Sequence, residues 1–148
     1  MLKEILTELF ARDLGKLEQE ISLYPTDESL WLTAEGISNS GGNLALHLCG
    51  NLNHFIGAQL GHTGYVRQRE KEFTTKGISR TQVIEDVKAT AHAVVKTLEQ
   101  ISEEELAKVF PLEVFGKPIQ TGFFLTHLTA HLNYHLGQIN YHRRLVAE

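Results

Sequence analysis

Apolar residues recur at helical spacing along four long segments, and this periodicity constrains the fold more than any other feature of the chain. The segments cover residues 2–24, 43–60, 79–100 and 121–146. Each can bury one apolar stripe against its neighbours, whereas the alternating patterns typical of strands are few and weak. The sequence therefore predicts an all-α protein, a bundle of four helices.

Two loops are expected on either side of the second helical segment. Pro25 ends the first helix, and residues 36–42 are rich in Ser, Gly and Asn, which is typical of a loop. Residues 65–77 are polar and carry several charges, so we expect a second loop there. Glu70 and Glu72 lie in this stretch, and we interpret them as part of a solvated charged surface.

The region before the last helix holds two shorter signals. Ser102 and Glu105 form a capping box, the pattern already present at Ser79 and Gln82, and predict a short extra helix. Residues 112–119 alternate weakly and fit a small hairpin or an extended turn. No internal repeat or low-complexity segment divides the chain, so we expect residues 1–148 to form a single domain.

Composition excludes several classes of function. The formal net charge is -4 and the basic residues are scattered, so we expect no nucleic-acid partner. No stretch has the ~18 apolar residues of a membrane helix, and we expect no membrane association. The amphipathic start does not resemble a targeting peptide. Because the single cysteine, Cys49, has no partner for an internal disulfide, a reducing, cytoplasmic location is expected.

Histidines gather on one side of the last helix. Four of the eight histidines fall within the last 22 residues, and seven side chains there follow helical spacing within roughly 80° of arc. These are Phe124, His127, His131, His135, Gln138, His142 and Leu145. The pattern predicts that the line faces the core. One buried histidine is explained by hydrogen bonds, but three in successive turns are more easily satisfied by a metal ion.

A third ligand is expected from another helix, because one helix seldom supplies a compact set of three. His47 and His54 lie two turns apart on one edge of the second helix. Asn51 lies one turn beyond His47, where it can hydrogen-bond a ligand or a bound water. Half-burial at a helix edge is the alternative interpretation of both histidines. Cys49 points away from His47 and is interpreted as a small core residue.

The chain resembles the DinB-like (DinB/YfiT) family of metal-binding helix bundles. Two motifs carry the resemblance, His47-Leu-Cys-Gly-Asn51 and His131-Leu-Asn-Tyr-His135-Leu-Gly-Gln138, and the segment RQREKEF resembles the loop of an uncharacterised branch. The resemblance implies an up-and-down four-helix bundle, often a homodimer. It also implies His47, His131 and His135 as ligands of one divalent metal, usually zinc or nickel. Leu136 replaces a basic residue that many relatives carry before the Gly.

An open three-histidine site leaves a coordination position for water or substrate, which is typical of catalytic metals. The donor set suits Zn or Ni, with Fe, Co or Mn as alternatives. The resemblance implies a metal-dependent transferase acting on a low-molecular-weight thiol. A metal-dependent hydrolase and a non-catalytic metal-binding protein remain alternatives, the latter with its fourth position closed by His54, His127 or a carboxylate.

Helper residues were sought among the polar side chains near the expected ligands. Gln138 and Asn51 are the best candidates, and His127 is a candidate general base or fourth ligand, with a packed core histidine as the alternative. No role follows for His142. Asp13 falls in the apolar stripe of the first helix, so we expect it to be buried and paired, at a subunit interface if the chain dimerises.

Overall fold

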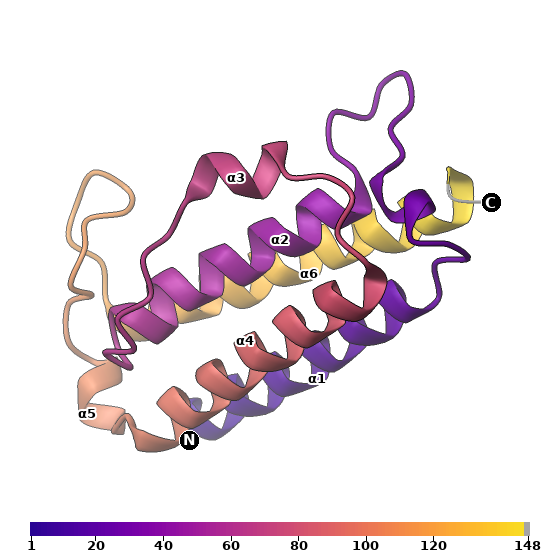
Figure 1. Ribbon diagram of the computed structural model, residues 1–148. Helices are drawn as coiled ribbons and strands as arrows, with labels where there is room; N and C mark the ends of the chain where they lie inside the picture. The colour runs from indigo at the N-terminus through magenta and orange to yellow at the C-terminus, as the bar shows by residue number, and fades with distance from the viewer. Residues whose placement is uncertain (147–148) are drawn as a thin grey trace.

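The computed structural model describes residues 1–146, and its regular structure is helical (Figure 1). Four long helices form the body: α1 (Leu2–Ser22), α2 (Gly41–Leu52), α4 (Arg80–Gln100) and α6 (Thr121–Leu145). Shorter elements join them: a 3₁₀ turn (Glu28–Trp31), a π-helical turn (Asn53–Ala58), α3 (Arg69–Thr74) and α5 (Glu103–Leu106). No strand occurs within residues 1–146, and the predicted all-α bundle is confirmed.

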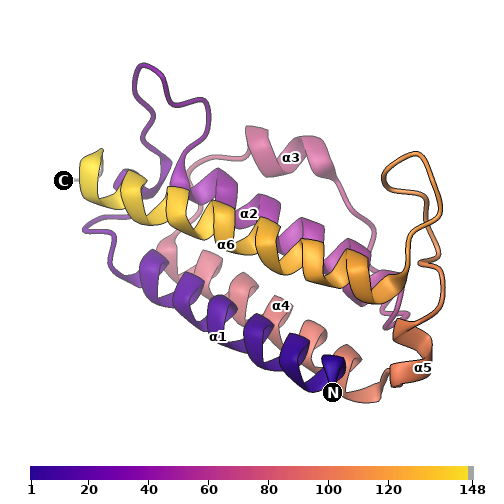
Figure 2. The same ribbon diagram turned by 180° about the vertical axis from the view of Figure 1, so that it is seen from behind.

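The long helices lie as two neighbouring pairs, α1 beside α4 and α2 beside α6 (Figures 1 and 2). Their directions depart from simple alternation, because α2 and α4 run the same way. Between them the chain crosses back along the outer side of α2 in a segment that includes α3. The start of α2 accordingly lies near this segment, where Asn43 donates to the carbonyl oxygen of Thr75 at 2.8 Å.

The interior is filled by aliphatic side chains from all four long helices. Leu6, Leu48, Val87 and Leu132, one from each helix, are fully buried. Burying such a side chain stabilises the fold by about 1.5–3 kcal/mol. The expected inward face of the second helix, with Leu48 at its centre, is confirmed. No helix in the described part of the chain is long and apolar enough to cross a membrane.

Serine caps start three of the helices, two of them at the predicted capping boxes. The side chains of Ser40, Ser79 and Ser102 accept from the amides of Asn43, Gln82 and Glu105. Each bond satisfies a backbone donor that the helix leaves without a partner. The predicted short helix after residue 102 is α5.

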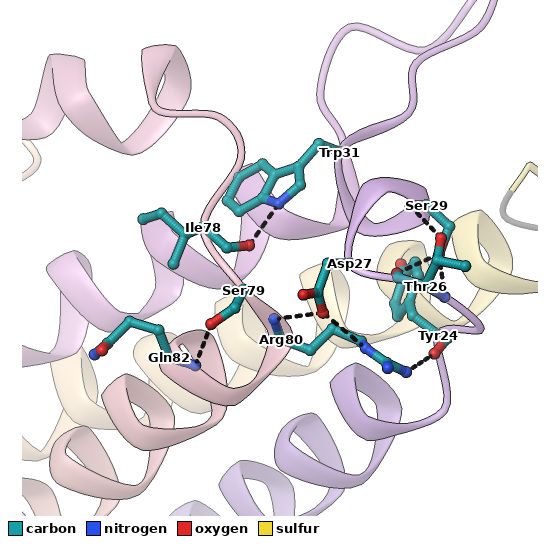
Figure 3. A network of polar contacts seen from close by, with 9 residues as sticks. All are labelled: Tyr24, Thr26, Asp27, Ser29, Trp31, Ile78, Ser79, Arg80 and Gln82. Carbon is teal, nitrogen blue, oxygen red and sulfur yellow. Dashed lines mark hydrogen bonds and ion pairs between the residues drawn. The ribbon is translucent and has the colours of Figure 1, made fainter.

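Polar contacts fix the connection after α1 to the start of α4 (Figure 3). Asp27 accepts from the backbone amide and the Nε of Arg80, at 3.0 and 3.1 Å. Arg80 also donates to the carbonyl oxygen of Tyr24. Trp31 donates from its indole nitrogen to the carbonyl oxygen of Ile78 at 2.9 Å. These contacts hold the connection between α1 and α2 against the segment that leads into α4.

Three local expectations need correction. The second helix was expected to run regularly to Leu60, but it becomes a π-helical turn at Asn53. The polar stretch 65–77 was expected to be a loop, but it contains α3. The hairpin expected at 112–119 is a loop closed by a single antiparallel bridge between Val109 and Gln120. The sequence did not predict α3, because the few side chains that this helix turns inward are polar or aromatic and give no aliphatic periodicity.

Candidate metal centre

Three imidazole rings converge between α2 and α6. His47 comes from α2, and His131 and His135 lie one turn apart on α6. The ring centre of His47 is 5.1 Å from that of His131 and 5.2 Å from that of His135. One nitrogen from each ring lies within 4.8 Å of the others, and within residues 1–146 this group has no fourth member. The group could hold a metal ion.

The spacing of two of these nitrogens suits a shared tetrahedral ion. His47 Nε2 and His131 Nε2 are 3.2 Å apart. Two imidazole nitrogens bound to one tetrahedral Zn²⁺, each at 2.0–2.1 Å, stand about 3.3 Å apart. The Nδ1 of His135 faces the side-chain oxygen of Gln138 at 2.7 Å, which leaves Nε2 of His135 for a ligand.

Nδ1 of His47 is hydrogen-bonded to the carboxylate of Glu72, a residue whose burial the sequence did not predict. Nδ1 of His47 donates to Oε1 of Glu72 at 3.0 Å. Arg67 donates to both oxygens of the same carboxylate, at 2.9 and 3.0 Å. Glu72 was expected to be solvated, but it is 6% exposed. A carboxylate in this place fixes the ring and leaves Nε2 as the ligand atom, which is the usual arrangement behind a metal-bound histidine.

The charge of Glu72 is stabilised despite its burial. Burial alone raises the pKa of a carboxyl, but the hydrogen bonds from His47 and Arg67 outweigh it and hold the pKa of Glu72 below its ordinary value. Arg67 lies over the ring of Phe55 at 5.8 Å, and Phe73 packs on His47 at 4.9 Å. These two rings shield the ion pair from water.

Gly50 makes room for this carboxylate on α2. A Cβ at Gly50 would overlap the carboxylate oxygens of Glu72. The glycine of the His47-Leu-Cys-Gly-Asn51 motif therefore allows α3 to bring its acid against the first turn after His47. The close approach joins two separate segments of the chain, so no local pattern in the sequence marks Glu72 as part of the site.

The two ligand candidates on α6 are neutral at physiological pH. Burial, and then the neighbouring His135 and His47, lower the pKa of His131 to about 4. Burial also lowers the pKa of His135, although its hydrogen bond with Gln138 opposes the shift. Nδ1 of His131 is buried and has no hydrogen-bond partner among the described residues. Neutral rings with free lone pairs are the form in which histidine binds metals, so the donor set fits a divalent transition ion.

The predicted helper residues occupy three different settings. Gln138 is exposed and holds the ring of His135. Asn51 is 7% exposed, and its Oδ1 has no hydrogen-bond partner in the described structure. His127 is exposed and lies against Phe115 and Phe124, at ring distances of 5.0 and 6.1 Å, so it is neither a core residue nor a member of the three-histidine group.

The histidine line of α6 follows the edge of the buried face, which corrects its expected core position. Phe124 and His142 of this line are buried as expected, but His131 and His135 are half-buried and His127, Gln138 and Leu145 are exposed. A continuous buried line runs beside it through Leu125, Leu128, Leu132, Leu136 and Ile139. The periodicity located the correct half of the helix, but an arc of side chains cannot tell the centre of a buried face from its border.

Two other histidines, His142 and His54, lie outside the three-histidine group. His142 is 5% exposed, with Nδ1 at 2.7 Å from the hydroxyl of Tyr24 and Nε2 at 2.8 Å from the carbonyl oxygen of Leu32. Both ring nitrogens are satisfied, so His142 pins the loop after α1 to α6. His54 is half-buried against Phe55 and does not join the three-histidine group.

Two further residues lie as expected from the sequence. Cys49 is buried, and burial raises the pKa of its thiol to about 12, which leaves it unreactive. Asp13 is 2% exposed and accepts from Arg12 at 2.9 Å and from Asn133 at 3.0 Å, so its expected burial and pairing are confirmed. The carboxylate thereby joins α1 to α6.

Two hollows reach the three histidines from opposite directions along α6. The first, of about 270 Å³, is lined by His47, Asn51, Phe55, Arg67, Arg69, Val114, Phe115, Phe124, His127, Leu128 and His131. The second, of about 480 Å³, is lined by Gly36, Ile37, Ser38, Asn39, Leu44, Tyr134, His135, Gln138, Tyr141, His142 and Leu145. Small molecules can therefore approach the group, and the arrangement is open rather than enclosed.

Comparisons with solved structures find the same fold. A DinB-like protein from Bacillus cereus superposes with a TM-score of 0.70 at 21% identity, over 89% of this chain and 84% of that one. A conserved protein from Enterococcus faecalis gives a TM-score of 0.77 at 18% identity, over 97% of this chain and 95% of that one. No curated protein matches the sequence. The resemblance stated from the two histidine motifs is therefore confirmed at the level of the fold.

The sequence itself matches one family model over nearly its whole length. That model, described as "Protein of unknown function (DUF1572)", covers residues 5–148. The matched span includes α2, α3 and α6, and therefore every residue of the candidate centre. The chain is a member of the DUF1572 family, built on the DinB-like helical fold.

Proposed function

We propose that this protein binds one divalent transition metal through His47, His131 and His135, and uses it as a metal-dependent thiol S-transferase. The observation that carries the metal site is the convergence of three imidazoles, with one nitrogen of each ring within 4.8 Å of the others. Glu72 and Gln138 hold the outer nitrogens of His47 and His135. Zinc and nickel are the ions that best suit this donor set.

An open coordination position is part of the proposal. A closed, purely structural site has four protein ligands, whereas catalytic sites keep three and leave one position for water or substrate. Neither His54, His127 nor a carboxylate joins the group within residues 1–146. This supports the catalytic alternative over the non-catalytic one. When bound, the metal would supply Lewis acidity and lower the pKa of a thiol or water placed on it.

The chain's own residues have separable roles in such a site. Glu72 keeps His47 in the tautomer whose Nε2 carries the lone pair, because its carboxylate accepts a hydrogen bond from the protonated Nδ1. Asn51 offers an unpaired amide oxygen to a donor on the substrate. His127 lines the first hollow and is exposed, so it can exchange a proton with solvent and with a molecule bound there. Phe55 and Phe124 line that hollow with apolar surface and meet edge to face at 5.0 Å.

The test compares metal-loaded and metal-stripped protein in a screen of low-molecular-weight thiols against small electrophiles. We expect conjugation that requires both the thiol and the metal, that is lost on chelation, and that returns when zinc or nickel is added. His131→Ala serves as the inactive control. Hydrolysis without added thiol would favour the hydrolase alternative. A protein that holds one metal per chain and is inert toward every pair would contradict the transferase proposal.

A further inference from the structure

The first hollow carries positive charge without any acid in its lining. Arg67 and Arg69 both line it, and none of the lining residues is Asp or Glu. The second hollow has no Asp, Glu, Lys or Arg in its lining. The two approaches to the histidines therefore differ in charge, and only the first favours an anion. A divalent ion on the histidines would add to this preference.

The two arginines of the first hollow are not equivalent. Arg67 is committed to Glu72 through two hydrogen bonds and is largely buried. Arg69 is exposed and lies over the ring of Phe73 at 5.5 Å. Its guanidinium makes no hydrogen bond or ion pair with any residue in the described part of the chain. Arg69 is therefore the cation available to a bound anion, with its planar fork suited to a carboxylate.

Aromatic rings form a further part of the lining, here called the phenylalanine wall: Phe55, Phe115 and Phe124. Phe55 and Phe124 meet edge to face at 5.0 Å, and Phe115 packs on Phe124 at 5.9 Å. Phe115 is still 43% exposed, which leaves apolar surface for another ring to cover. The volume of about 270 Å³ is slightly below the ~300–1,000 Å³ typical of small-molecule pockets, so the occupant is small.

A buried polar atom in the same lining lacks a partner. Oδ1 of Asn51 has no hydrogen bond, although the residue is only 7% exposed. A buried carbonyl oxygen without a donor is costly, and a water molecule enclosed by a ligand in the hollow can donate to it. Together with Arg69 and the phenylalanine wall, this atom marks the hollow as a built binding site.

We propose that the first hollow binds a small aromatic carboxylate, with Arg69 holding the carboxylate and the phenylalanine wall packing the ring. The inference rests on the proposed function, since it names the substrate class of the same site. Its recognition elements belong to the protein and not to the metal. The dependence on Arg69 is therefore expected in the metal-stripped protein as well as in the zinc-loaded one.

The experiment measures binding of 3-phenylpropionate by calorimetry, with 3-phenylpropionamide and propionate as matched probes. We expect 3-phenylpropionate to bind at least ten-fold more tightly than either, because the amide lacks the charge and propionate lacks the ring. Arg69→Gln should weaken 3-phenylpropionate on the order of ten-fold or more. Arg144→Gln is the control, because Arg144 also lies over a ring, that of Tyr141 at 4.8 Å, but lines neither hollow.

Failure of this inference is separable from failure of the metal site. Elemental analysis of every sample reports the metal content independently of the calorimetry. A protein without metal contradicts the proposed function, whereas Arg69-dependent binding to that protein still supports the carboxylate site. Equal affinity of Arg69→Gln and the unchanged protein, equal affinity for the acid and the amide, or no binding of 3-phenylpropionate would overturn the inference.

Discussion

The carboxylate of Glu72 joins Arg67 to His47 of the candidate metal centre. Glu72 accepts one hydrogen bond from His47 and two from Arg67, and it is nearly enclosed. Removing charge from a buried, satisfied network leaves the remaining partners poorly matched, here the guanidinium of Arg67. We therefore expect metal affinity to depend on the partner that holds His47 in place as well as on the three histidines.

Glu72→Gln is expected to weaken metal binding by about 10–100-fold while leaving the helical content unchanged. The amide keeps the shape of the side chain but accepts the His47 proton more weakly and no longer balances Arg67. Metal affinity measured by competition with a chelator of known strength tests this. Glu70→Gln is the control, because Glu70 lies two residues away and is exposed. Equal losses in both variants would contradict a specific role for Glu72.

At the scale of elements, α3 packs across α2 and approaches it closely at Gly50. Gly50 on α2 and Glu72 on α3 meet there, and Asn43 at the start of α2 donates to the carbonyl oxygens of Glu72 and Thr75. The π-helical turn that follows α2 carries Asn53, which donates to Thr90 of α4 at 2.9 Å. Contacts with the α3 segment and with α4 therefore hold α2, the helix that supplies His47, in place without a ligand.

Gly50→Ala is expected to weaken metal binding by about ten-fold or more with little loss of fold stability. The added methyl displaces the flexible end of Glu72, so the bundle tolerates it, but His47 loses its partner. Metal affinity and the melting temperature of the stripped protein separate the two effects. Gly137→Ala on α6 is the matched control, because no atom lies within 4 Å of the added methyl. It should raise stability by ~0.5–1 kcal/mol without changing affinity.

Sequence reasoning recovered the elements with strong periodicity and missed those held by polar contacts. The four long helices and the caps at Ser79 and Ser102 follow from local pattern, whereas His47 was chosen over His54 only through the family resemblance. The burial of Glu72 does not follow from such a pattern, because it depends on α3 crossing α2 at Gly50, a contact between segments that no local pattern records. For the same reason His142 showed no role until Tyr24 and Leu32 were placed beside it.

At the scale of the whole molecule, the bundle has a large aliphatic core that does not involve the metal site. Fully buried side chains come from all four long helices, and the histidines lie at the border of the buried face. The metal-stripped protein is therefore expected to fold. A bound ion should raise the melting temperature by mass action, because it binds the folded state and not the unfolded one.

Leu48→Asp is expected to unfold the bundle with or without metal. The side chain of Leu48 is fully buried on α2, and a carboxylate there has no partner to offset its desolvation. Circular dichroism should show loss of helix and of the cooperative melt. A normal melting transition in this variant would contradict the packing of α2 described above.

Acid is expected to destabilise the metal-stripped protein as the pH falls from about 6.5 toward 4. His131 has a pKa of about 4 when folded, against an ordinary value of 6.5, so the unfolded chain binds the proton first and the folded state loses relative stability across that interval. Denaturant unfolding at several pH values measures the effect. His131→Gln should flatten the profile in this window, and an unchanged profile would contradict the burial of a neutral ring.

The central claim is that imidazoles from two separate helices bind one ion. Elemental analysis of the purified protein and of three alanine variants tests it most directly. We predict one divalent transition metal per chain, none in His131→Ala or His135→Ala, and strongly reduced occupancy in His47→Ala, all with helical content preserved. Full metal content in all three variants would contradict the claim.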